Sequence, residues 1–530
     1  MMDADVRPTH GMRLDELVRE LPDGARLVGR GDVVVTGVRQ DSRRVRPGDL
    51  FCVRRGQHAD GAKFVLDAKR AGAVAVLAEE GVAVEPHELP IILVQNATIG
   101  LAVASAAVYE HPSFGLEVIG ITGTNGKTTT THLVRAAIDG VLREPRCGLI
   151  GTVGYRYRDL FIDAAHTTPE ADELARAMLL MRRSGATQIA MEVSSIAIEL
   201  GRVHAVRWTV AAFTNLTQDH LDFHGTMEAY GEAKAKLFLA GPQHAVICID
   251  GAFGRALADR VEATSVRLHS THDLAAARGV LRVSAKVGTE DADIVPTRLA
   301  LDARGIHATL RTPRGELELR SPLVGAHNVE NLVVALGIVH VLGLDLRTAA
   351  EALAEERGAP GRLERCDGPA DDLSVLVDYA HTPDALARAL DALRAVSSSR
   401  VICVFGCGGD RDPHKRGPMG RAVAERADVV VVTSDNPRSE APEAIAAPIV
   451  EAVIAAKSAA FDGERGYFVE LDRRAAIDRA IALARPGDTV LVAGKGHEDY
   501  QIVGTEKRHF DDREEARRAL SERRAKRERP

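Results

Sequence analysis

Short runs of β-branched residues alternate with alanine- and leucine-rich stretches along most of the chain, and this alternation restricts the folds that it can adopt. Parallel strands are covered by helices on both faces, so they stand out in a sequence as continuous apolar runs. The alternation therefore predicts an α/β protein with largely parallel sheets. A strand-rich, helix-poor stretch near 278–323 interrupts the pattern, and we expect an antiparallel edge there. The candidate strands are VVVTGV (33–38), VIGIT (118–122), QIAMEV (188–193), TVAAF (209–213), AVICI (245–249), VLVDY (375–379), VICVF (401–405), VVVVT (429–433) and TVLVA (489–493).

Two breaks divide this pattern. HPSFG (111–115) separates a helix from the next strand, and ERGAPGR (356–362) carries two glycines and a proline after another helix. A chain of 530 residues is also too long for a single hydrophobic core. We therefore predict three domains, which are an N-terminal domain of residues 1–113, a central domain of residues 114–357 and a C-terminal domain of residues 358–530.

Composition and charge exclude several classes of protein. The formal net charge is −7, which argues against nucleic acid as the main partner. The chain starts without an apolar signal core, no stretch approaches the length of a membrane span, and the six cysteines show no metal-ligand spacing. We therefore expect a cytoplasmic protein with free thiols and no membrane partner, and we expect a monomer. The basic tail SERRAKRERP (521–530) is predicted to be a frayed, solvated end.

VIGITGTNGKTTTTHLV (118–134) places a glycine-rich loop between a predicted strand and a predicted helix. Glycines let backbone N–H groups turn towards phosphate oxygens, and the start of the helix adds positive potential. We expect Lys127 to reach the terminal phosphates and the Thr128 hydroxyl to help to hold Mg²⁺. The spacing differs from G-x-x-x-x-G-K-T, because Ile121 stands where that motif has glycine. The loop and its context nevertheless predict a nucleotide-binding site.

Acidic and histidine side chains follow two further candidate strands. Glu192 lies at the end of QIAMEV, and FTNLTQDHLDFHG (213–225) contains Asp219, His220, Asp222 and His224. Ligands of α/β proteins lie at the carboxyl ends of the strands, and Mg²⁺ prefers oxygen ligands and tolerates an imidazole. Glu192 and His220 are therefore the predicted metal-binding pair.

EAYGEAKAKLF (228–238) is predicted to form an amphipathic helix. Lysines on such a helix are normally solvated, and the local pattern does not distinguish Lys234 from Lys236.

Taken together, the motifs of the chain resemble one family. GTNGKTTT, MEVSS, FTNLTQDHLDFHG, YGEAK, GAHNVEN, PGR, DYAHTPDAL, FGCGGDRDPHKRGPMG, SDNPR and AGKGHEDYQ occur in the order that is typical of the Mur ligases. The resemblance extends over all three predicted domains. It implies a central P-loop ATPase-like parallel sheet and a C-terminal Rossmann-like domain.

The resemblance also implies an activity, namely ATP-dependent amide formation in peptidoglycan precursor synthesis. The implied substrates are UDP-MurNAc-L-Ala-D-Glu, meso-diaminopimelate and ATP, and the implied metal is Mg²⁺. ATP would phosphorylate the D-glutamate side-chain carboxylate, and the amine of the amino acid would attack the resulting acyl phosphate. Phosphoryl transfer of this kind depends mainly on positioning and charge neutralisation.

Site residues follow from the resemblance position by position. Lys127, Glu192, His220 and Lys234 are similar to the family's catalytic residues, and Lys234 matches its carbamylated lysine (N6-carboxylysine). Thr128, Glu192 and His220 are the implied metal ligands. The implied ATP contacts are Gly123, Thr124, Asn125, Gly126, Lys127, Thr128, Thr129, Asn328, Asn331, Arg362 and Asp378. The implied contacts with the UDP-MurNAc-dipeptide are Ser42, Thr167, Thr168, Ser194 and Arg202. Ile196 and Leu200 depart from the family, which usually has histidine and sometimes has glutamine at these positions.

TSDNPRSE (433–440) follows a run of four valines, and its residues by themselves are typical of a proline turn. The resemblance implies that this turn binds the substrate, because diaminopimelate carries a carboxylate that lysine lacks. Arg438 can bind that carboxylate through two hydrogen bonds. The implied diaminopimelate contacts are Arg411, Asp435, Asn436, Pro437, Arg438, Gly494 and Glu498.

Three alternatives remain open from the sequence. The chain could add lysine instead of diaminopimelate, although lysine-adding enzymes replace the arginine of DNPR. It could be a folylpolyglutamate synthetase-like ligase, which SDNPR, GCGGDRD and AGKGHE disfavour. It could also be a catalytically silent nucleotide-binding protein, which the presence of Lys127, Glu192, His220 and Lys234 opposes.

Overall fold

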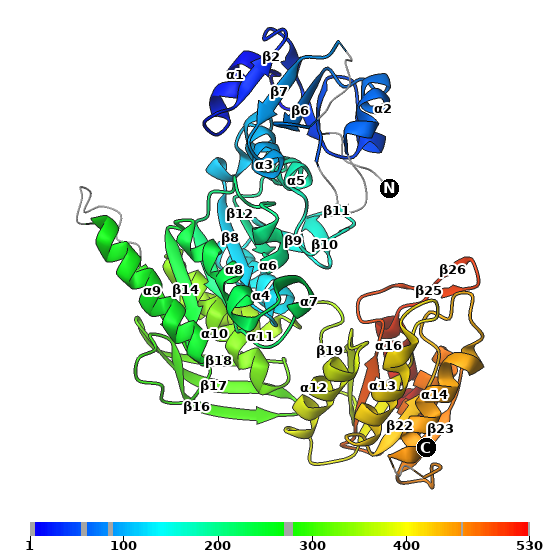
Figure 1. The fold of residues 1–530 in the computed structure, drawn as a ribbon. Helices are drawn as coiled ribbons and strands as arrows, with labels where there is room; N and C mark the ends of the chain where they lie inside the picture. The colour runs from blue at the N-terminus through cyan, green and yellow to red at the C-terminus, as the bar shows by residue number, and fades with distance from the viewer. Residues whose placement is uncertain (1–5, 55–60, 83–87, 270–278, 457–458, 528–530) are drawn as a thin grey trace. The chain divides into compact units, whose positions relative to one another are not determined.

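A computed structural model describes residues 6–54, 61–82, 88–269, 279–456 and 459–527 (Figure 1). The chain forms two compact units. Unit 1 comprises Met1–Ser284, Glu290–Ile294 and Val333–Ala349, and unit 2 comprises Ala285–Thr289, Val295–Leu332 and Ala350–Pro530. The predicted α/β class with largely parallel sheets is confirmed in both units.

Unit 1 begins with a five-stranded sheet in the order β2-β7-β6-β5-β4. Its strands are parallel except for β2, which pairs antiparallel with β7 at one edge. The run VVVTGV does not form one strand, because β3 pairs with β1 and β4 pairs with β5. The elements are β1 (Met12–Arg13), α1 (Leu14–Glu20), β2 (Arg26–Val28), β3 (Val34–Val35), β4 (Gly37–Arg39), η1 (Ser42–Arg44), β5 (Asp49–Cys52), η2 (Gly61–Phe64), α2 (Val65–Arg70), β6 (Ala75–Glu79), β7 (Ile91–Val94), α3 (Ala97–Val108) and η3 (Pro112–Gly115).

The second sheet of unit 1 has eight strands in the order β11-β10-β9-β12-β8-β13-β14-β15. The strands β9, β12, β8, β13, β14 and β15 are parallel to one another. The strands β10 and β11 form an antiparallel edge next to β9. The elements are β8 (Glu117–Thr122), α4 (Lys127–Leu142), β9 (Cys147–Gly151), β10 (Gly154–Tyr157), β11 (Leu160–Ile162), α5 (Ala171–Arg183), β12 (Gln188–Glu192), α6 (Ser195–Glu199), β13 (Val210–Phe213), α7 (Leu221–His224), α8 (Met227–Leu239), β14 (His244–Cys248), α9 (Ala252–His269) and β15 (Gly279–Val283). The register places the carboxyl end of β8 between those of β12 and β13, because Ile121 pairs with Glu192 and Thr122 pairs with Phe213.

The stretch near 278–323 contains more than the predicted antiparallel edge. Its first strand, β15, joins the eight-stranded sheet in parallel with β14. The next three form a separate antiparallel sheet in the order β16-β17-β18. These strands are β16 (Val295–Asp302), β17 (Gly305–Thr312) and β18 (Gly315–Ser321), and two helices follow, α10 (Ala326–Val341) and α11 (Leu346–Glu355).

The C-terminal part of unit 2 contains a six-stranded sheet in the order β19-β20-β24-β21-β22-β23. All its pairings are parallel except that of β19 with β20. The elements are β19 (Glu364–Arg365), β20 (Ser374–Asp378), α12 (Pro383–Arg394), β21 (Val401–Phe405), η4 (Pro413–Lys415), α13 (Arg416–Ala424), β22 (Val429–Val432), α14 (Pro442–Ala455), β23 (Gly466–Val469), α15 (Arg473–Leu483), β24 (Thr489–Ala493), β25 (Tyr500–Val503), β26 (Glu506–His509) and α16 (Asp512–Arg527).

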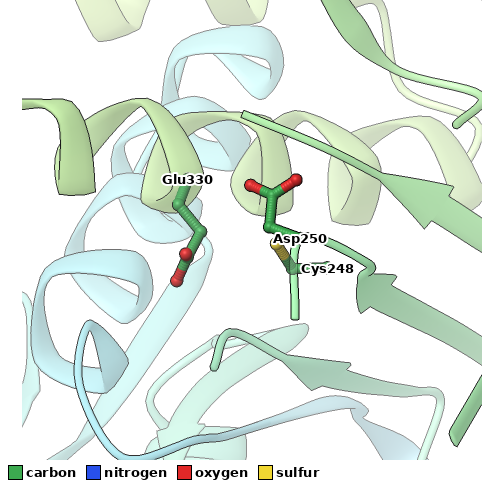
Figure 2. Close-up of side chains that lie close together, drawn as sticks. All are labelled: Cys248, Asp250 and Glu330. Atoms are coloured by element: carbon green, nitrogen blue, oxygen red, sulfur yellow. The ribbon is translucent and has the colours of Figure 1, made fainter. Parts of the chain in front are cut away.

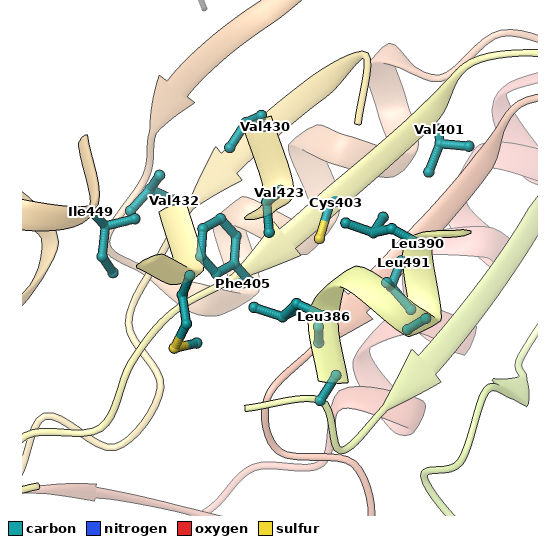
Figure 3. Close-up of a cluster of buried hydrophobic side chains, with 14 of the residues drawn as sticks. Leu386, Leu390, Val401, Cys403, Phe405, Val423, Val430, Val432, Ile449 and Leu491 are labelled. Atoms are coloured by element: carbon teal, nitrogen blue, oxygen red, sulfur yellow. The ribbon is translucent and has the colours of Figure 1, made fainter. Parts of the chain in front are cut away.

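Apolar side chains fill both faces of this sheet because successive residues of a strand point to opposite faces. On one face, Phe405 of β21 packs among Val430, Val432 and Leu491 of neighbouring strands (Figure 3). A second buried cluster on the other face includes Val404 and Val431. The sheet is thus covered on both sides, as the continuous apolar runs predict.

The basic tail is not a frayed end as far as Arg527. It forms the last turns of α16, and Arg523 is bound to Asp372 through two hydrogen bonds of 2.9 Å each. The nearby carboxylates offset the positive charge of the helix, which composition alone does not reveal. Within the described residues, no helix combines the length and apolarity that are needed to cross a lipid bilayer.

Candidate active site

The phosphate loop lies directly after β8 and is built around two glycines in left-handed backbone conformations. Gly123 has φ +152°, and a Cβ atom there would lie 1.9 Å from the Thr214 hydroxyl oxygen. Gly126 has φ +85° and caps the N-terminus of α4. The Asn125 backbone N–H donates to the Asn215 side-chain oxygen at 3.0 Å, so the loop is tied to the segment after β13. The predicted strand, loop and helix are all present.

Lys127 begins α4 and folds back over the loop. Its ammonium group donates to the carbonyl oxygens of Gly123 and Thr124, both at 2.9 Å. The side chain is half-buried, so its charge lies at the loop and not in bulk solvent. This is the placement that neutralisation of a bound phosphate requires.

Thr128 and Glu192 meet at the carboxyl edge of the sheet. The Thr128 hydroxyl donates to Glu192 Oε2 at 2.8 Å, and the Thr152 backbone N–H donates to Glu192 Oε1 at 2.8 Å. Glu192 is only 1% exposed, so these donors balance a buried carboxylate. A hydroxyl and a carboxylate oxygen are hard ligands of the kind that Mg²⁺ prefers, and this pair fits the predicted metal. The role of Thr152 was missed, because nothing in its local sequence indicates it.

His220 does not join this pair. Its side chain is 43% exposed, and its ring lies 3.7 Å from Asp219 and 6.1 Å, centroid to centroid, from Tyr230. Within the described residues it makes no hydrogen bond with Glu192. The residue has φ +50° just before the short helix α7, and the left-handed backbone places it on the exposed side of the loop. The predicted role of His220 as a metal ligand remains a prediction.

Lys234 is buried, against the expectation that the lysines of this helix are solvated. Its residue exposure is 1%, and its amino group donates to the Gly123 carbonyl oxygen at 2.9 Å. Burial, followed by the charge of Lys127, lowers the pKa of Lys234 from 10.5 to about 6. Lys236, two residues later, is 53% exposed and pairs with Glu199 at 2.6 Å. Packing therefore separates two lysines that the sequence pattern did not distinguish.

Tyr230 connects Lys234 to the phosphate loop. Its ring lies 4.3 Å from the Lys234 amino group, and its hydroxyl donates to the Thr124 hydroxyl oxygen at 3.2 Å. A ring face next to an amine stabilises the protonated form, so this contact opposes the effect of burial. Tyr230 was not predicted, although its spacing of four residues from Lys234 places the two on one face of α8.

Four of the five predicted dipeptide contacts lie near Glu192. The Thr168 hydroxyl donates to the Glu192 carbonyl oxygen at 2.9 Å and accepts from the Ser194 backbone N–H at 3.0 Å. Arg202 donates to the Thr168 carbonyl oxygen at 3.1 Å, and Thr167 accepts from the Thr152 hydroxyl at 3.2 Å. Through Thr152 and Glu192, these four residues form one hydrogen-bonded network at the same sheet edge as the phosphate loop.

Ser42 lies apart from this group, in a groove of about 870 Å³. It begins η1, whose N-cap Asp41 accepts from the Arg43 backbone N–H at 3.0 Å. Arg43 and Arg44 also line the groove, where they pair with Asp41 and Glu173, so its lining combines cationic and acidic groups.

In unit 2, Asp378 ends β20 and holds the turn that carries Arg362. Asp378 Oδ2 accepts from the Leu363 backbone N–H at 2.7 Å, and Oδ1 accepts from the Ala380 backbone N–H at 2.8 Å. Burial raises the pKa of Asp378, and the charge of Arg362 opposes this. The Arg362 guanidinium lies 5.1 Å from the centroid of the Tyr379 ring.

Asn328 and Asn331 occupy the first turns of α10. The Asn328 amide donates to the Val324 carbonyl oxygen at 2.8 Å and accepts from the Asn331 amide at 2.8 Å. Both are buried, at 3% and 2% exposure. The roles of both residues in ATP binding remain predictions.

The residues predicted to bind diaminopimelate gather at the carboxyl ends of β22 and β24, with Lys495 at their centre. The Lys495 amino group lies 3.2 Å from Asn436 Oδ1 and 3.7 Å from both Asp435 Oδ1 and Glu498 Oε2. Its side chain is fully buried, and burial lowers its pKa and raises that of Glu498. Gly494 has φ +122°, and a Cβ there would lie 2.9 Å from Asp435 Oδ2. Lys495 was missed, although a lysine between the glycines of AGKGHE was a usable signal.

Arg438 has φ +53°, and both its backbone N–H and its carbonyl oxygen are hydrogen-bonded. Its N–H donates to the Ile502 carbonyl oxygen at 3.1 Å, and its carbonyl oxygen accepts from Gly504 at 2.7 Å. The guanidinium donates to the Gly409 carbonyl oxygen at 2.7 Å and is half-buried. Arg411 is exposed. Pro437, which precedes Arg438, contacts Gly409 closely enough that a Cβ on that glycine would lie 1.9 Å from the Pro437 carbonyl oxygen.

Figure 2 shows Cys248 at the end of β14, Asp250 just after it and Glu330 on α10. Asp250 Oδ1 accepts from the Ser284 hydroxyl at 2.5 Å, so this carboxylate ties β14 to the residue after β15.

Three family models match the chain. They are "Mur ligase family, catalytic domain" over residues 34–113, "Mur ligase middle domain" over residues 121–339 and "Mur ligase, glutamate ligase domain" over residues 361–496. A UDP-N-acetylmuramoyl-L-alanyl-D-glutamate–2,6-diaminopimelate ligase of Gloeobacter violaceus is 43% identical over 97% of this chain and 99% of its own length. The ligase of the same name from Synechococcus elongatus is 45% identical over 93% of this chain and 95% of its own length.

Solved structures agree with these matches. A structure named as a UDP-N-acetylmuramoyl-L-alanyl-D-glutamate–2,6-diaminopimelate ligase superposes with a TM-score of 0.69 at 32% identity, and covers 97% of this chain and 99% of that one. MurF from Acinetobacter baumannii shares the fold, with a TM-score of 0.61 at 19% identity over 92% of this chain and 96% of that one.

Proposed function

The chain belongs to the Mur ligase family of ATP-dependent amide-forming ligases, and on that premise we propose that it joins meso-diaminopimelate to UDP-MurNAc-L-Ala-D-Glu. The observation that carries the proposal is the convergence of three groups at the loop after β8. The Lys127 and Lys234 amino groups both donate to the Gly123 carbonyl oxygen, and Thr128 binds Glu192 beside them. Phosphate, metal and acceptor carboxylate would meet at this point.

The first chemical step transfers the γ-phosphoryl group of ATP to the D-glutamate side-chain carboxylate. A carboxylate oxygen attacks phosphorus, the bond to the β-phosphate oxygen breaks, and ADP leaves. Both reactants are anionic, so their repulsion must be offset by the Lys127 ammonium. Mg²⁺, when bound, would supply further charge neutralisation, and Thr128 and Glu192 are the residues that would hold it. Thr168, Ser194 and Arg202 would orient the dipeptide next to Glu192.

Lys234 has the properties that carbamylation requires. An amine reacts with CO₂ only when it is neutral, and with a pKa of about 6 the Lys234 amine is mostly neutral at pH 7. A carbamate there would replace a cation with an anionic oxygen ligand next to the phosphate loop. This supports, as a proposal, the role of Lys234 as a modified metal-positioning residue.

The second step forms the amide. The amine of diaminopimelate attacks the acyl carbon, a proton is lost from nitrogen, and inorganic phosphate leaves. Arg438 would bind the distal carboxylate of diaminopimelate, and Asp435, Asn436 and Glu498 would accept hydrogen bonds from its distal amino group. Lysine lacks that carboxylate, so its binding would leave the arginine without an anionic partner.

Amino-acid-dependent release of phosphate from ATP, in the presence of UDP-MurNAc-L-Ala-D-Glu, tests the proposal. Release with meso-diaminopimelate and not with lysine is the expected result. Release with lysine alone would assign the chain to the lysine-adding members, and release with neither would overturn the proposal.

A further inference from the structure

Arg362 lies in a turn whose backbone is left-handed on both sides of it. Gly361 has φ +66° and Leu363 has φ +43°, so two left-handed residues flank it. Leucine adopts this conformation only at a cost in free energy, and such a conformation persists where the surroundings hold it. The turn is also tightly packed, because a Cβ on Gly361 would lie 2.2 Å from the Gly496 carbonyl carbon. The direction of Arg362 therefore depends on what holds these two neighbours.

Two carboxylates hold the turn from opposite ends. Asp378 accepts from the Leu363 backbone N–H at 2.7 Å, and Glu364 Oε2 accepts from the Gly361 backbone N–H at 2.8 Å. The Gly361 carbonyl oxygen in turn accepts from the Tyr379 N–H at 2.8 Å. Asp378 is a predicted nucleotide contact, whereas Glu364 is not part of the mechanism above.

Glu364 is held by the C-terminal helix. Arg517 of α16 donates to Glu364 Oε1 at 2.9 Å, and an Arg513 guanidinium nitrogen lies 3.6 Å from Oε2. The Glu364 side chain is 12% exposed, so the ion pair with Arg517 is largely shielded from solvent on the carboxylate side. The hydrogen bond from Arg517 to Oε1 therefore restricts the orientation of the carboxylate whose other oxygen accepts from the Gly361 N–H. Figure 1 labels α16 and the strand β19, which begins with Glu364.

We infer that Glu364 is a positioning residue and that Arg517 acts through it to hold Arg362 in place for the nucleotide. The inference rests on the proposed function, because it takes Arg362 as a contact to ATP. It gives the last helix of the chain a role in nucleotide affinity, although none of its residues is a predicted ATP contact.

Arg517→Ala tests this relation, and Arg518→Ala is the matched control. Arg518 is on the same helix and bonds to Glu515, Asp478 and Glu522, but not to Glu364. We expect Arg517→Ala to raise the KM for ATP about three- to tenfold with a much smaller change in the KM for diaminopimelate. Arg518→Ala should leave both KM values unchanged. Arg517→Lys, which keeps a cation, should restore much of the ATP affinity.

Glu364→Gln gives an independent measurement of the same link. Glutamine keeps an acceptor for the Gly361 N–H and removes the charge that Arg517 binds. The KM of the Glu364→Gln variant for ATP should therefore rise as it does in Arg517→Ala. An unchanged KM for ATP in both variants would overturn the inference. So would an equal rise in Arg518→Ala, because that would show a general effect of α16 on stability.

A double variant separates this inference from the proposed function. If Arg517 acts through Arg362, adding Arg517→Ala to Arg362→Ala should not raise the KM for ATP further. A full additional rise would overturn the inference. If Arg362→Ala itself leaves the KM for ATP unchanged, the assignment of Arg362 as a nucleotide contact fails, and the inference fails with it. If Arg362→Ala raises the KM and Arg517→Ala does not, only the inference fails.

Discussion

Lys234→Met tests whether the buried amine is neutral in the folded protein. The pKa of Lys234 is lowered from 10.5 to about 6, so between these values the unfolded chain binds a proton that the folded chain does not. The free energy of unfolding therefore rises with pH across this window, by about 1.4 kcal/mol for each pH unit near pH 8. This gain is lost as the pH falls towards 6. Methionine has a similar length and no titratable group, so the variant should lack this contribution.

Proton uptake on unfolding is the most direct measure of this difference. A chain with several sheets does not have to unfold in one step, so a single free energy of unfolding is not well defined for it. Unfolding of the wild type in urea at about pH 8, in CO₂-free solution, should take up about one proton more than unfolding of Lys234→Met. The uptake can be measured from the pH change in weakly buffered solution. Lys236→Met is the control. Lys236 is exposed on the same helix, and its replacement should leave the uptake at the wild-type value.

The same variants test carbamylation. With ¹³C-labelled bicarbonate, the wild type and Lys236→Met should each show a labile carbamate signal that Lys234→Met lacks. Equal proton uptake in the wild type and Lys234→Met would refute the reasoning, because Lys234 would then be charged in the folded state. A neutral Lys234 without a carbamate signal would refute the modification and leave the neutral amine in place.

Three further substitutions have defined outcomes. Glu192→Gln should lower kcat for phosphate release by about 10²-fold or more at saturating Mg²⁺, because it removes a charge that the metal would need. A change in kcat of less than about threefold would contradict that role. Arg438→Ala should raise the KM for diaminopimelate about 10- to 100-fold, because a charge-assisted contact is lost, and should leave the KM for ATP unchanged. An equal rise in both KM values would show that the residue holds the fold instead. Lys495→Met removes the cation 3.7 Å from both Asp435 and Glu498, and its loss raises the pKa of Glu498, which burial already raises, still further. The KM for diaminopimelate in that variant should therefore fall as the pH rises through the raised pKa of Glu498, while the wild-type KM changes less over the same range. Parallel pH profiles would contradict this reasoning.

The positions of the candidate strands along the chain and the place of the phosphate loop follow from the sequence alone. Every candidate strand forms at or within a few residues of its predicted range, and only VVVTGV is divided between two pairings. The reason is that apolar runs and glycine positions are local properties of the chain, and parallel sheets place their ligands at one edge. The location of Glu192 and Gly123 at neighbouring strand ends was therefore predictable.

Packing decided what the local pattern left open. Lys234 and Lys236 lie two residues apart on one helix, yet only the first is buried, because tertiary contacts select which face of α8 is covered. The Thr128–Glu192 bond, the Lys495 cluster and the contact of Arg517 with Glu364 each join residues from separate elements. Charge and exposure at such sites depend on desolvation by distant parts of the chain, and no local pattern encodes that. The sequence by itself determined the elements, the family and most of the residues that could act. Only the tertiary structure decided which of them are buried, paired and held in one direction.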